Sequence, residues 1–483
     1  MLRDLIKEGG LYTLVNFLTK GVSLLLLPFY TSYFLPEDYG VIEMFTIFGY
    51  FITGIFTLQL NQGLARYVTE PTFKRIDKIE YASTAVWLSA LSLLISFAVL
   101  GLTAPLFIDF FFDSEMVSVR LYVTAIASIL VNAVFFFLGV YFRFLRETTI
   151  FSVMSFIHAL LGILLTWMFV AVFEMGIESI YISYLIITPV LILIQLYLLG
   201  YRLKFKIFKN KVSDLIKFSL PMIPLTVATS LMVISDRIFI KYYEDLAQLG
   251  IYGIGAKFAT IISITVGGFS MAIIPLVLEK HLNEQTKTEL KKIFYLFFSV
   301  GTFGLLTLSL FAKETIILIT NEKYLEAHTV MPYLYCSALF IGLQMFSHGL
   351  FIKKKTGQMA IITMIFASVN IGLNFLLIPD MGIVGAAVAT LIATIGQQIT
   401  LFIFSQRHFK VNIHYPKIIV LTVLSFGIIM FFAYFEFTDY WISVLSRILS
   451  ISLFLVILNL TGVLDFKRLK KFLLKKLNRS KIA

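Results

Sequence analysis

Windows of about 20 apolar residues recur along almost the whole 483-residue chain, separated by short polar gaps. The hydrocarbon core of a bilayer is about 30 Å thick, and a helix of roughly 20 residues crosses it. Because a helix satisfies its backbone hydrogen bonds internally even in lipid, the pattern predicts an all-α integral membrane protein. We predict fourteen transmembrane helices, at residues 11–34, 41–60, 82–104, 121–142, 151–173, 179–200, 217–240, 250–276, 293–312, 328–351, 358–378, 383–405, 416–435 and 441–463.

The composition excludes a soluble globular enzyme and a nucleic-acid-binding protein. Hydrophobic residues make up 59% of the chain and charged residues 14%, whereas soluble domains average roughly 45–50% and 25%. The single cysteine, Cys336, excludes an intramolecular disulfide. The first residues lead into an apolar run without a small-residue cleavage site, so we expect a retained first helix and no removable signal peptide.

The net charge of +12 is explained mainly by membrane orientation. Cytoplasmic loops are enriched in Lys and Arg. With the N-terminus inside, the cytoplasmic segments hold 32 of the 40 basic residues, counting Lys217 and Lys417 at the inner ends of their spans. The outer segments hold four, Arg120, Lys241, Lys313 and Lys323. The even number of spans then places both termini in the cytoplasm. The Lys-rich tail, residues 465–483, is predicted to form a basic amphipathic helix on the anionic cytoplasmic leaflet, with a merely solvated tail as the alternative.

Two short sequence matches indicate an internal repeat. Residues 174–177 match 380–383 with a shift of 206, and residues 38–41 match 248–251 with a shift of 210. Similar shifts indicate that helices 1–6 recur as helices 7–12 with the same orientation, related by an axis along the membrane normal. The predicted parts are an N-lobe (1–200), a basic cytoplasmic linker (201–216), a C-lobe (217–405), two further helices (406–464) and the tail.

Three groups of residues, together with the fourteen-helix layout, give the chain a resemblance to the Wzx-type O-antigen flippases, the polysaccharide-exporter branch of the multidrug/oligosaccharidyl-lipid/polysaccharide (MOP) flippase superfamily. The first is Lys20-Gly21 followed by 24–28 and 35–40. The second comprises 218–224, 235–237 and 249–253, and the third is 381–387. The resemblance implies two six-helix lobes in a V around a central cavity, with two extra C-terminal helices.

The resemblance also implies a function. Members move undecaprenyl-diphosphate-linked glycans from the cytoplasmic to the outer leaflet of the bacterial inner membrane, by alternating access between the lobes. For this chain it implies a polyprenyl-diphosphate-linked oligosaccharide as substrate, used for O-antigen, capsule or exopolysaccharide. The polysaccharide polymerase machinery is an expected partner and nucleic acid is not. We expect a monomer.

Basic residues near or within spans are the first candidates for holding a diphosphate. Charges inside a membrane are costly and usually face a cavity or a partner, and desolvated Lys and Arg bind phosphate oxygens strongly. The predicted cationic cavity contains Lys20, Lys257, Arg237 and Arg66. Lipid II flippases, which are similar, carry essential basic residues on helices one, two and eight. Lys20 and Lys257 match helices one and eight, whereas helix two departs from that pattern.

Two acidic residues in spans are candidates for coupling or for charge balance, Asp236 and Glu43. Asp236 is a candidate to neutralise Lys257. The uncharged candidates for glycan contacts are Asn132, Asn370, Asn374 and Gln397, although amide side chains also hold helices together in lipid. Asn370 and Asn374 are four residues apart and therefore share one helix face.

Two other functions remain as alternatives. An ion-coupled multidrug or cation antiporter of the same superfamily usually has twelve helices and an acidic cavity, unlike this chain. A membrane enzyme such as a glycan polymerase needs a sizeable outer catalytic loop, which the predicted topology lacks, and we find no phosphate loop or metal-ligand motif. We therefore expect neither catalytic residues nor a cofactor, and an H⁺ gradient, a Na⁺ gradient and the membrane potential are the candidate driving forces.

Overall fold

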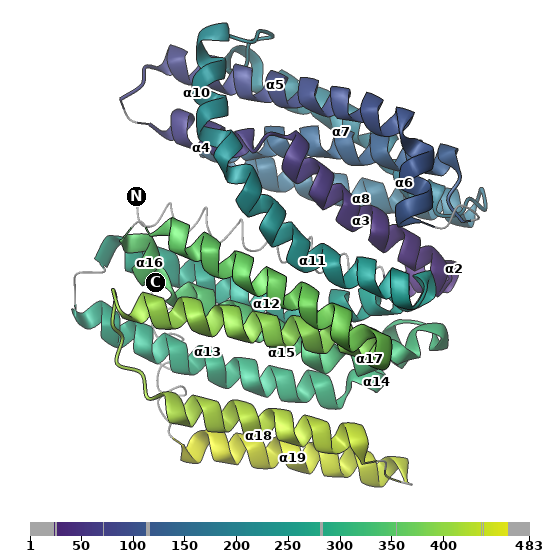
Figure 1. Ribbon diagram of the computed structural model, residues 1–483, viewed down its shortest axis with the longest axis vertical. Coiled ribbons are helices and arrows are strands. Elements are labelled where there is room, and N and C mark those ends of the chain that lie inside the picture. Colours follow the sequence, from purple (N-terminus) through teal and green to yellow (C-terminus); the bar gives the residue numbers. More distant parts are fainter. Residues whose placement is uncertain are drawn as a thin grey trace, which may run out of the picture. The chain divides into compact units, whose positions relative to one another are not determined.

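The computed structural model describes Leu24 and residues 27–461, except residues 71, 113–115, 281–283, 354, 436 and 438. This part contains helices and no strand, which confirms the predicted fold class (Figure 1). Its α-helices are α2 (Leu27–Tyr33), α3 (Pro36–Phe56), α4 (Leu60–Thr69), α5 (Arg75–Leu102), α6 (Ala104–Phe111), α7 (Val119–Phe144), α8 (Thr148–Ala171), α9 (Glu178–Leu199), α10 (Lys209–Ser219), α11 (Ile223–Tyr243), α12 (Leu246–Lys280), α13 (Glu284–Leu310), α14 (Ala312–Ile319), α15 (Met331–Ile341), α16 (His348–Ile352), α17 (Thr356–Gln406), α18 (Tyr415–Tyr434) and α19 (Tyr440–Leu460).

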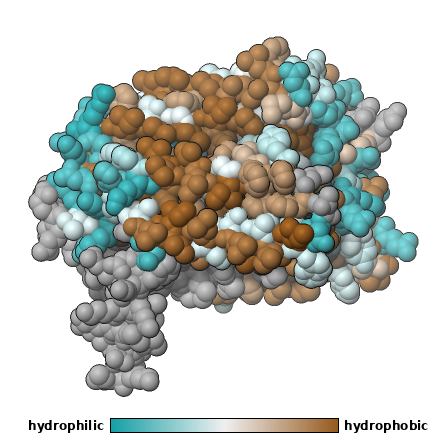
Figure 2. Space-filling view, turned by 90° about the horizontal axis from the view of Figure 1, so that it is seen from below, coloured by the Kyte–Doolittle hydropathy of each residue, from teal (hydrophilic) through white to brown (hydrophobic). Residues whose placement is uncertain are grey.

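The described part is that of a multi-pass membrane protein. Ten of its helices are long and apolar enough to cross a membrane, or up to twelve if each of two bent helix pairs is one span. Figure 2 shows one face of the molecule, on which apolar residues form a band between hydrophilic residues at both ends. Exposed apolar side chains such as Leu453 on α19, 60% exposed, are those expected to contact lipid. The predicted span 11–34 lies mostly outside the described residues, as does the predicted helix of the tail.

Several predicted spans differ in shape from straight helices. The spans 358–378 and 383–405 form a single 51-residue element, α17, which bends at Gly382, where φ is 55°. Glycine has no Cβ and adopts this left-handed conformation without strain. The predicted span 217–240 corresponds to α10 and α11, bent by 42°, and 328–351 corresponds to a pair bent by 53°. Prolines at the starts of α11 and α15 lack the N–H that would continue the preceding helix.

The chain divides into two compact units. The first comprises Met1–Ile254 and Thr363–Thr390, and the second comprises Gly255–Ile362 and Leu391–Ala483. The first unit therefore includes α11, the first turns of α12 and the middle of α17 in addition to α2–α10. The predicted lobes, with boundaries at 200 and 405, follow a different division and stay a prediction.

Within the first unit, the beginnings of α3 and α12 approach each other through two glycines. A Cβ added to Gly40 would lie 1.9 Å from the backbone oxygen of Leu246, and one added to Gly250 would lie 2.0 Å from the backbone oxygen of Pro36. The contact is reciprocal, because each glycine faces the backbone carbonyl of the residue four positions before the other glycine. These positions differ by 210, which is the predicted repeat shift, and the contact has the reciprocity expected where two copies of a repeat meet.

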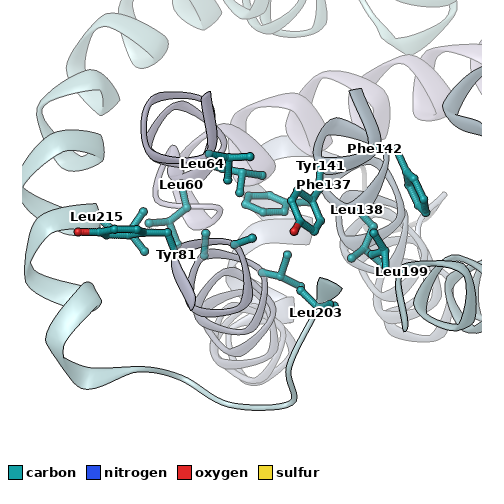
Figure 3. Packing of buried hydrophobic residues seen from close by; sticks show 14 residues of the cluster. Leu60, Leu64, Tyr81, Phe137, Leu138, Tyr141, Phe142, Leu199, Leu203 and Leu215 are labelled. Carbon is teal, nitrogen blue, oxygen red and sulfur yellow. The ribbon is translucent and has the colours of Figure 1, made fainter. Parts of the chain in front are cut away.

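The predicted linker packs onto the first unit. Leu203 and Leu215 enter an apolar core formed with α4, α5 and α7 (Figure 3). The backbone N–H of Lys204 donates to Ser83 Oγ at 2.8 Å, and the Trp87 indole donates to the Lys204 carbonyl oxygen at 2.8 Å. Lys211 pairs with Asp77 at 2.9 Å. The linker is thus held at several points along α5.

Candidate functional site

A cavity of about 520 Å³ lies between α3 and α7 in the first unit. On α3 and at its C-cap the lining residues include Thr46, Tyr50, Thr53 and Thr57, spaced three or four apart and therefore on one face of the helix. On α7 they include Asn132, which was predicted from the sequence to contact the glycan. None of the described lining residues is charged: they are Thr46, Gly49, Tyr50, Thr53, Gly54, Thr57, Gln59, Asn61, Ile129, Asn132, Ala133, Phe136, Phe137 and Val140.

The α3 wall of the cavity offers mainly hydrogen-bond acceptors. The hydroxyls of Thr46, Thr53 and Thr57 each donate their hydrogen to the backbone carbonyl four residues earlier, at 2.7–2.8 Å. Their oxygens keep lone pairs for a further donor. The Gln59 amide nitrogen likewise donates to the Gly54 carbonyl oxygen at 2.7 Å. Tyr50, 67% exposed, adds a ring face and a hydroxyl that both donates and accepts. Such a wall suits the hydroxyls of a sugar.

A buried ionic cluster surrounds Asp236 on α11. The Asp236 side chain is 1% exposed. Its carboxylate accepts hydrogen bonds from the hydroxyls of Tyr252 at 3.0 Å and Thr390 at 2.6 Å, and from the Asn374 amide at 2.8 Å. These donors replace water around the buried charge and reduce the cost of its burial.

Arg237 joins this cluster to α3. Its Nη2 lies 3.4 Å from Glu43 Oε1, and its Nη1 lies 3.7 Å from Asp236 Oδ2. The guanidinium also stacks over the ring of Tyr252, 5.1 Å from the centroid. Glu43 in turn contacts Gly253, where an added Cβ would lie 3.1 Å from the carboxylate carbon. Two carboxylates therefore share one guanidinium within this cluster.

Asn370 and Asn374 on α17 complete the cluster. They are 1% and 0% exposed, and the Ser235 hydroxyl donates to Asn370 Oδ1 at 2.6 Å. Asn374 donates to Asn370 Oδ1 at 3.4 Å, so the two share one face as their spacing predicts. Asn374 Oδ1 is buried without a hydrogen-bond partner among the described residues. In this conformation a sugar reaches neither amide, and contact with glycan stays a prediction for both.

The remaining predicted residues lie elsewhere. Arg66 on α4 is exposed and stacks over the Phe218 ring at 5.3 Å from the centroid. Lys257 on α12 and Gln397 on α17 are half-buried and belong to the second unit. Lys20 lies outside the described residues. The structure therefore brings together Glu43, Asp236, Arg237, Asn370 and Asn374, and places Asn132 at the separate cavity.

The sequence interpretation missed the threonines and Tyr50 on α3 and the hydroxyl donors Tyr252 and Thr390. The spacing of Thr46, Tyr50, Thr53 and Thr57 was a usable signal, because it marks one polar face inside an apolar span. No comparable signal connects Asp236 with Thr390, 154 residues away.

The chain matches the model of a family described as "Polysaccharide biosynthesis protein" over residues 5–281. No curated protein sequence matches it.

Solved structures with a similar fold include a lipid II flippase MurJ in an inward closed conformation, with 18% identity, 94% of this chain and 100% of that chain covered, and a TM-score of 0.71. An inward-facing multidrug resistance MATE family transporter of the MOP superfamily matches with 14% identity, coverage of 82% and 94%, and a TM-score of 0.66. A MOP superfamily transporter from Pyrococcus furiosus, whose title mentions a binding pocket of reverse polarity, matches with 15% identity, coverage of 84% and 94%, and a TM-score of 0.57. These proteins share the fold.

Proposed function

The chain belongs to the polysaccharide biosynthesis protein family, and we propose that it is a flippase for a polyprenyl-diphosphate-linked oligosaccharide, working by alternating access. The observation that carries the proposal is the cavity between α3 and α7, which places uncharged hydroxyl and amide groups along membrane-spanning helices. A glycan crossing a bilayer must exchange its hydrogen bonds to water for such groups. A drug or cation antiporter would be expected to present carboxylates to its cavity instead.

The proposal is tested by surface glycan display in the native host. A strain lacking the gene should lose display and accumulate the lipid-linked oligosaccharide inside, and the wild-type gene should restore display. Unchanged display in the deletion strain, together with increased sensitivity to cationic drugs, would favour the antiporter.

The diphosphate is assigned to Lys20 and Lys257 in this proposal. Arg237 is engaged by Glu43, Asp236 and the Tyr252 ring, so a phosphate would have to compete with groups already in place. Arg66 is exposed on α4 and lies outside the described lining of the cavity. Lys20 and Lys257 each lie well inside a predicted span, where a charge is retained for a partner or a function.

The ionic cluster at Asp236 supports a coupling role. With both carboxylates ionised, Glu43, Asp236 and Arg237 carry one net negative charge, and Asn374 adds an unpartnered oxygen. A bound proton or Na⁺ would balance this charge, and its release would link the cluster to a transmembrane gradient. The membrane potential alone is the remaining alternative.

Asp236→Asn tests the coupling role. The amide oxygen still accepts from Tyr252 and Thr390, so we expect the fold to be kept while the charge is lost. Transport in vesicles should fall and should no longer respond to an imposed Na⁺ or pH gradient. The matched control is Asp439→Asn at the start of α19, where Asn caps a helix as well as Asp does. A gradient response equal to that of the wild type would exclude Asp236 from coupling.

We place the protein in the bacterial cytoplasmic membrane with both termini in the cytoplasm. The basic-residue distribution supports this orientation. In a Cys336→Ala background, cysteines at Lys323 and Lys209, both exposed, test it in intact cells. An impermeant thiol reagent should label the cysteine at 323 and not the one at 209, while both should react in opened membranes. Labelling of 209 from outside would refute the topology.

A further inference from the structure

Asn132, on the α7 wall of the cavity, has a fixed side-chain orientation. Its Oδ1 accepts a hydrogen bond from the Thr188 hydroxyl on α9 at 2.8 Å and lies 2.9 Å from His158 Nε2 on α8. Two groups from neighbouring helices thus hold the same oxygen. Asn132 Nδ2, which carries two N–H donors, has no acceptor among the described residues.

His158 is itself held in place. Its side chain is 5% exposed and stacks on the Phe135 ring, with centroids 4.5 Å apart and planes inclined by 16°. Tyr184 packs nearby, with centroids 5.0 Å apart. His158 Nε2 also lies 3.0 Å from the Thr188 hydroxyl oxygen. Because Asn132 Oδ1 is an acceptor, Nε2 carries the proton. The His158 contacts therefore favour one orientation of the Asn132 amide. The proposed transport has no other use for this buried imidazole.

A second amide in the cavity, that of Asn61, also has its oxygen engaged by a donor. Asn61 Oδ1 accepts from the backbone N–H of Gln62 at 3.0 Å, and Asn61 Nδ2 has no acceptor among the described residues. The cavity therefore presents two amide donors, from Asn61 and Asn132, together with the hydroxyl oxygens of the α3 threonines. An uncharged sugar satisfies both sets, because its hydroxyls donate to the threonines while its ring, hydroxyl or acetamido oxygens accept from the amides.

We propose that Asn132 donates from Nδ2 to an acceptor oxygen of an uncharged sugar in the cavity, and that His158 and Thr188 are positioning residues that hold this donor toward the glycan. The proposal rests on the proposed flippase function and specifies the part of the substrate that the cavity recognises. Rotation of the amide would present Oδ1 instead of Nδ2 and would remove the donors. Loss of either support should therefore weaken binding of the glycan without affecting the lipid diphosphate.

The test compares two ligands with purified full-length protein. The first is the lipid-linked oligosaccharide fraction extracted from the deletion strain, and the second is undecaprenyl diphosphate, which has no sugar. Apparent dissociation constants follow from the rise in melting temperature with ligand concentration. Asn132→Leu and Thr188→Val should weaken binding of the first ligand about tenfold, the effect of losing a hydrogen bond to a desolvated partner. Binding of the second should be unchanged. Thr302→Val, which removes a buried hydroxyl on α13, is the matched control.

Two substitutions of His158 separate positioning from packing. His158→Gln keeps a donor near the position of Nε2 but loses the stack on Phe135, whereas His158→Phe keeps a ring and loses the donor. We expect His158→Gln to bind the glycan lipid within about threefold of the wild type and His158→Phe to bind it about tenfold more weakly. Equal affinities for all folded variants, or the reverse order at His158, would overturn the positioning role. Failure of the wild-type protein to bind the fraction would overturn the proposed function instead.

Discussion

Lys257→Ala should abolish most surface glycan display, whereas Lys257→Arg should retain much of it, and the same pair of changes at Lys20 should behave alike. A charged side chain at the centre of a span raises the free energy of membrane insertion by at least roughly 2.5 kcal/mol, so a lysine there is expected to have a role. Ala removes the charge-assisted hydrogen bonds to a diphosphate, while Arg keeps a cation of similar reach. Display is measured in the deletion strain, with each variant present in the membrane at the wild-type level.

Lys206→Ala provides the matched control, because Lys206 is an exposed linker residue that lies outside the spans. It should leave display unchanged. Normal display by both the Lys20→Ala and Lys257→Ala proteins would refute the cationic cavity.

A double substitution tests whether Lys257 serves only to balance Asp236. If it did, Asp236→Ala combined with Lys257→Ala would regain the display that either single change removes. We expect no rescue, because Asp236 already accepts hydrogen bonds from Tyr252, Thr390 and Asn374. Recovery in the double variant would assign Lys257 to charge balance.

Gly250→Ala should lower the melting temperature of the purified protein by several degrees. The new methyl group would lie 2.0 Å from the Pro36 carbonyl oxygen, so α3 and α12 would have to separate by more than 1 Å to reach ordinary contact. Overpacking of this kind costs about 1–3 kcal/mol. The separation would also stretch the contact between Glu43 on α3 and Gly253 on α12. Display should fall with stability.

Gly101→Ala on α5 is the matched control for this substitution, because a Cβ there would have nothing within 4 Å. Replacing a helical glycine by alanine normally stabilises a protein by about 0.5–1 kcal/mol. The control should therefore melt at or above the wild-type temperature. Equal melting temperatures for the two variants would show that the glycine contact does not constrain the fold.

The sequence predicted the existence and class of the elements better than their shape. Hydropathy located the apolar helices because a spanning helix must be apolar along most of its length. It divided α17 at the correct place, near Gly382, but could not show that both halves remain one bent element. Residues of α4 and α6 fall mainly between the predicted spans. Both helices are shorter than a span, and a hydropathy window that averages over about 20 residues does not detect them.

For the candidate site, sequence reasoning identified charged and amide residues and missed their partners. Asp236, Arg237 and Glu43 were conspicuous because ionisable groups are rare in spans. The hydroxyls that bind Asp236 were not conspicuous, because Thr and Tyr are common in membrane helices. His158 carries no sequence signal of its role, since its partners Asn132 and Thr188 lie 26 and 30 residues away in the sequence. The packing of α7, α8 and α9 brings these three residues together, and this packing cannot be recognised from a single sequence.

The reciprocal contact of Gly40 and Gly250 has the form of an isologous dimer interface. In a two-fold dimer, residue i of one subunit meets residue j of the other, and j meets i. Here the two helices belong to one chain, so the two sides of the contact are free to differ. One turn further along the helices they do differ: Glu43 occupies one side and Gly253, 210 positions later, leaves room for it on the other. A homodimer would place two carboxylates at this contact. The single chain places only Glu43 there and pairs it with Arg237.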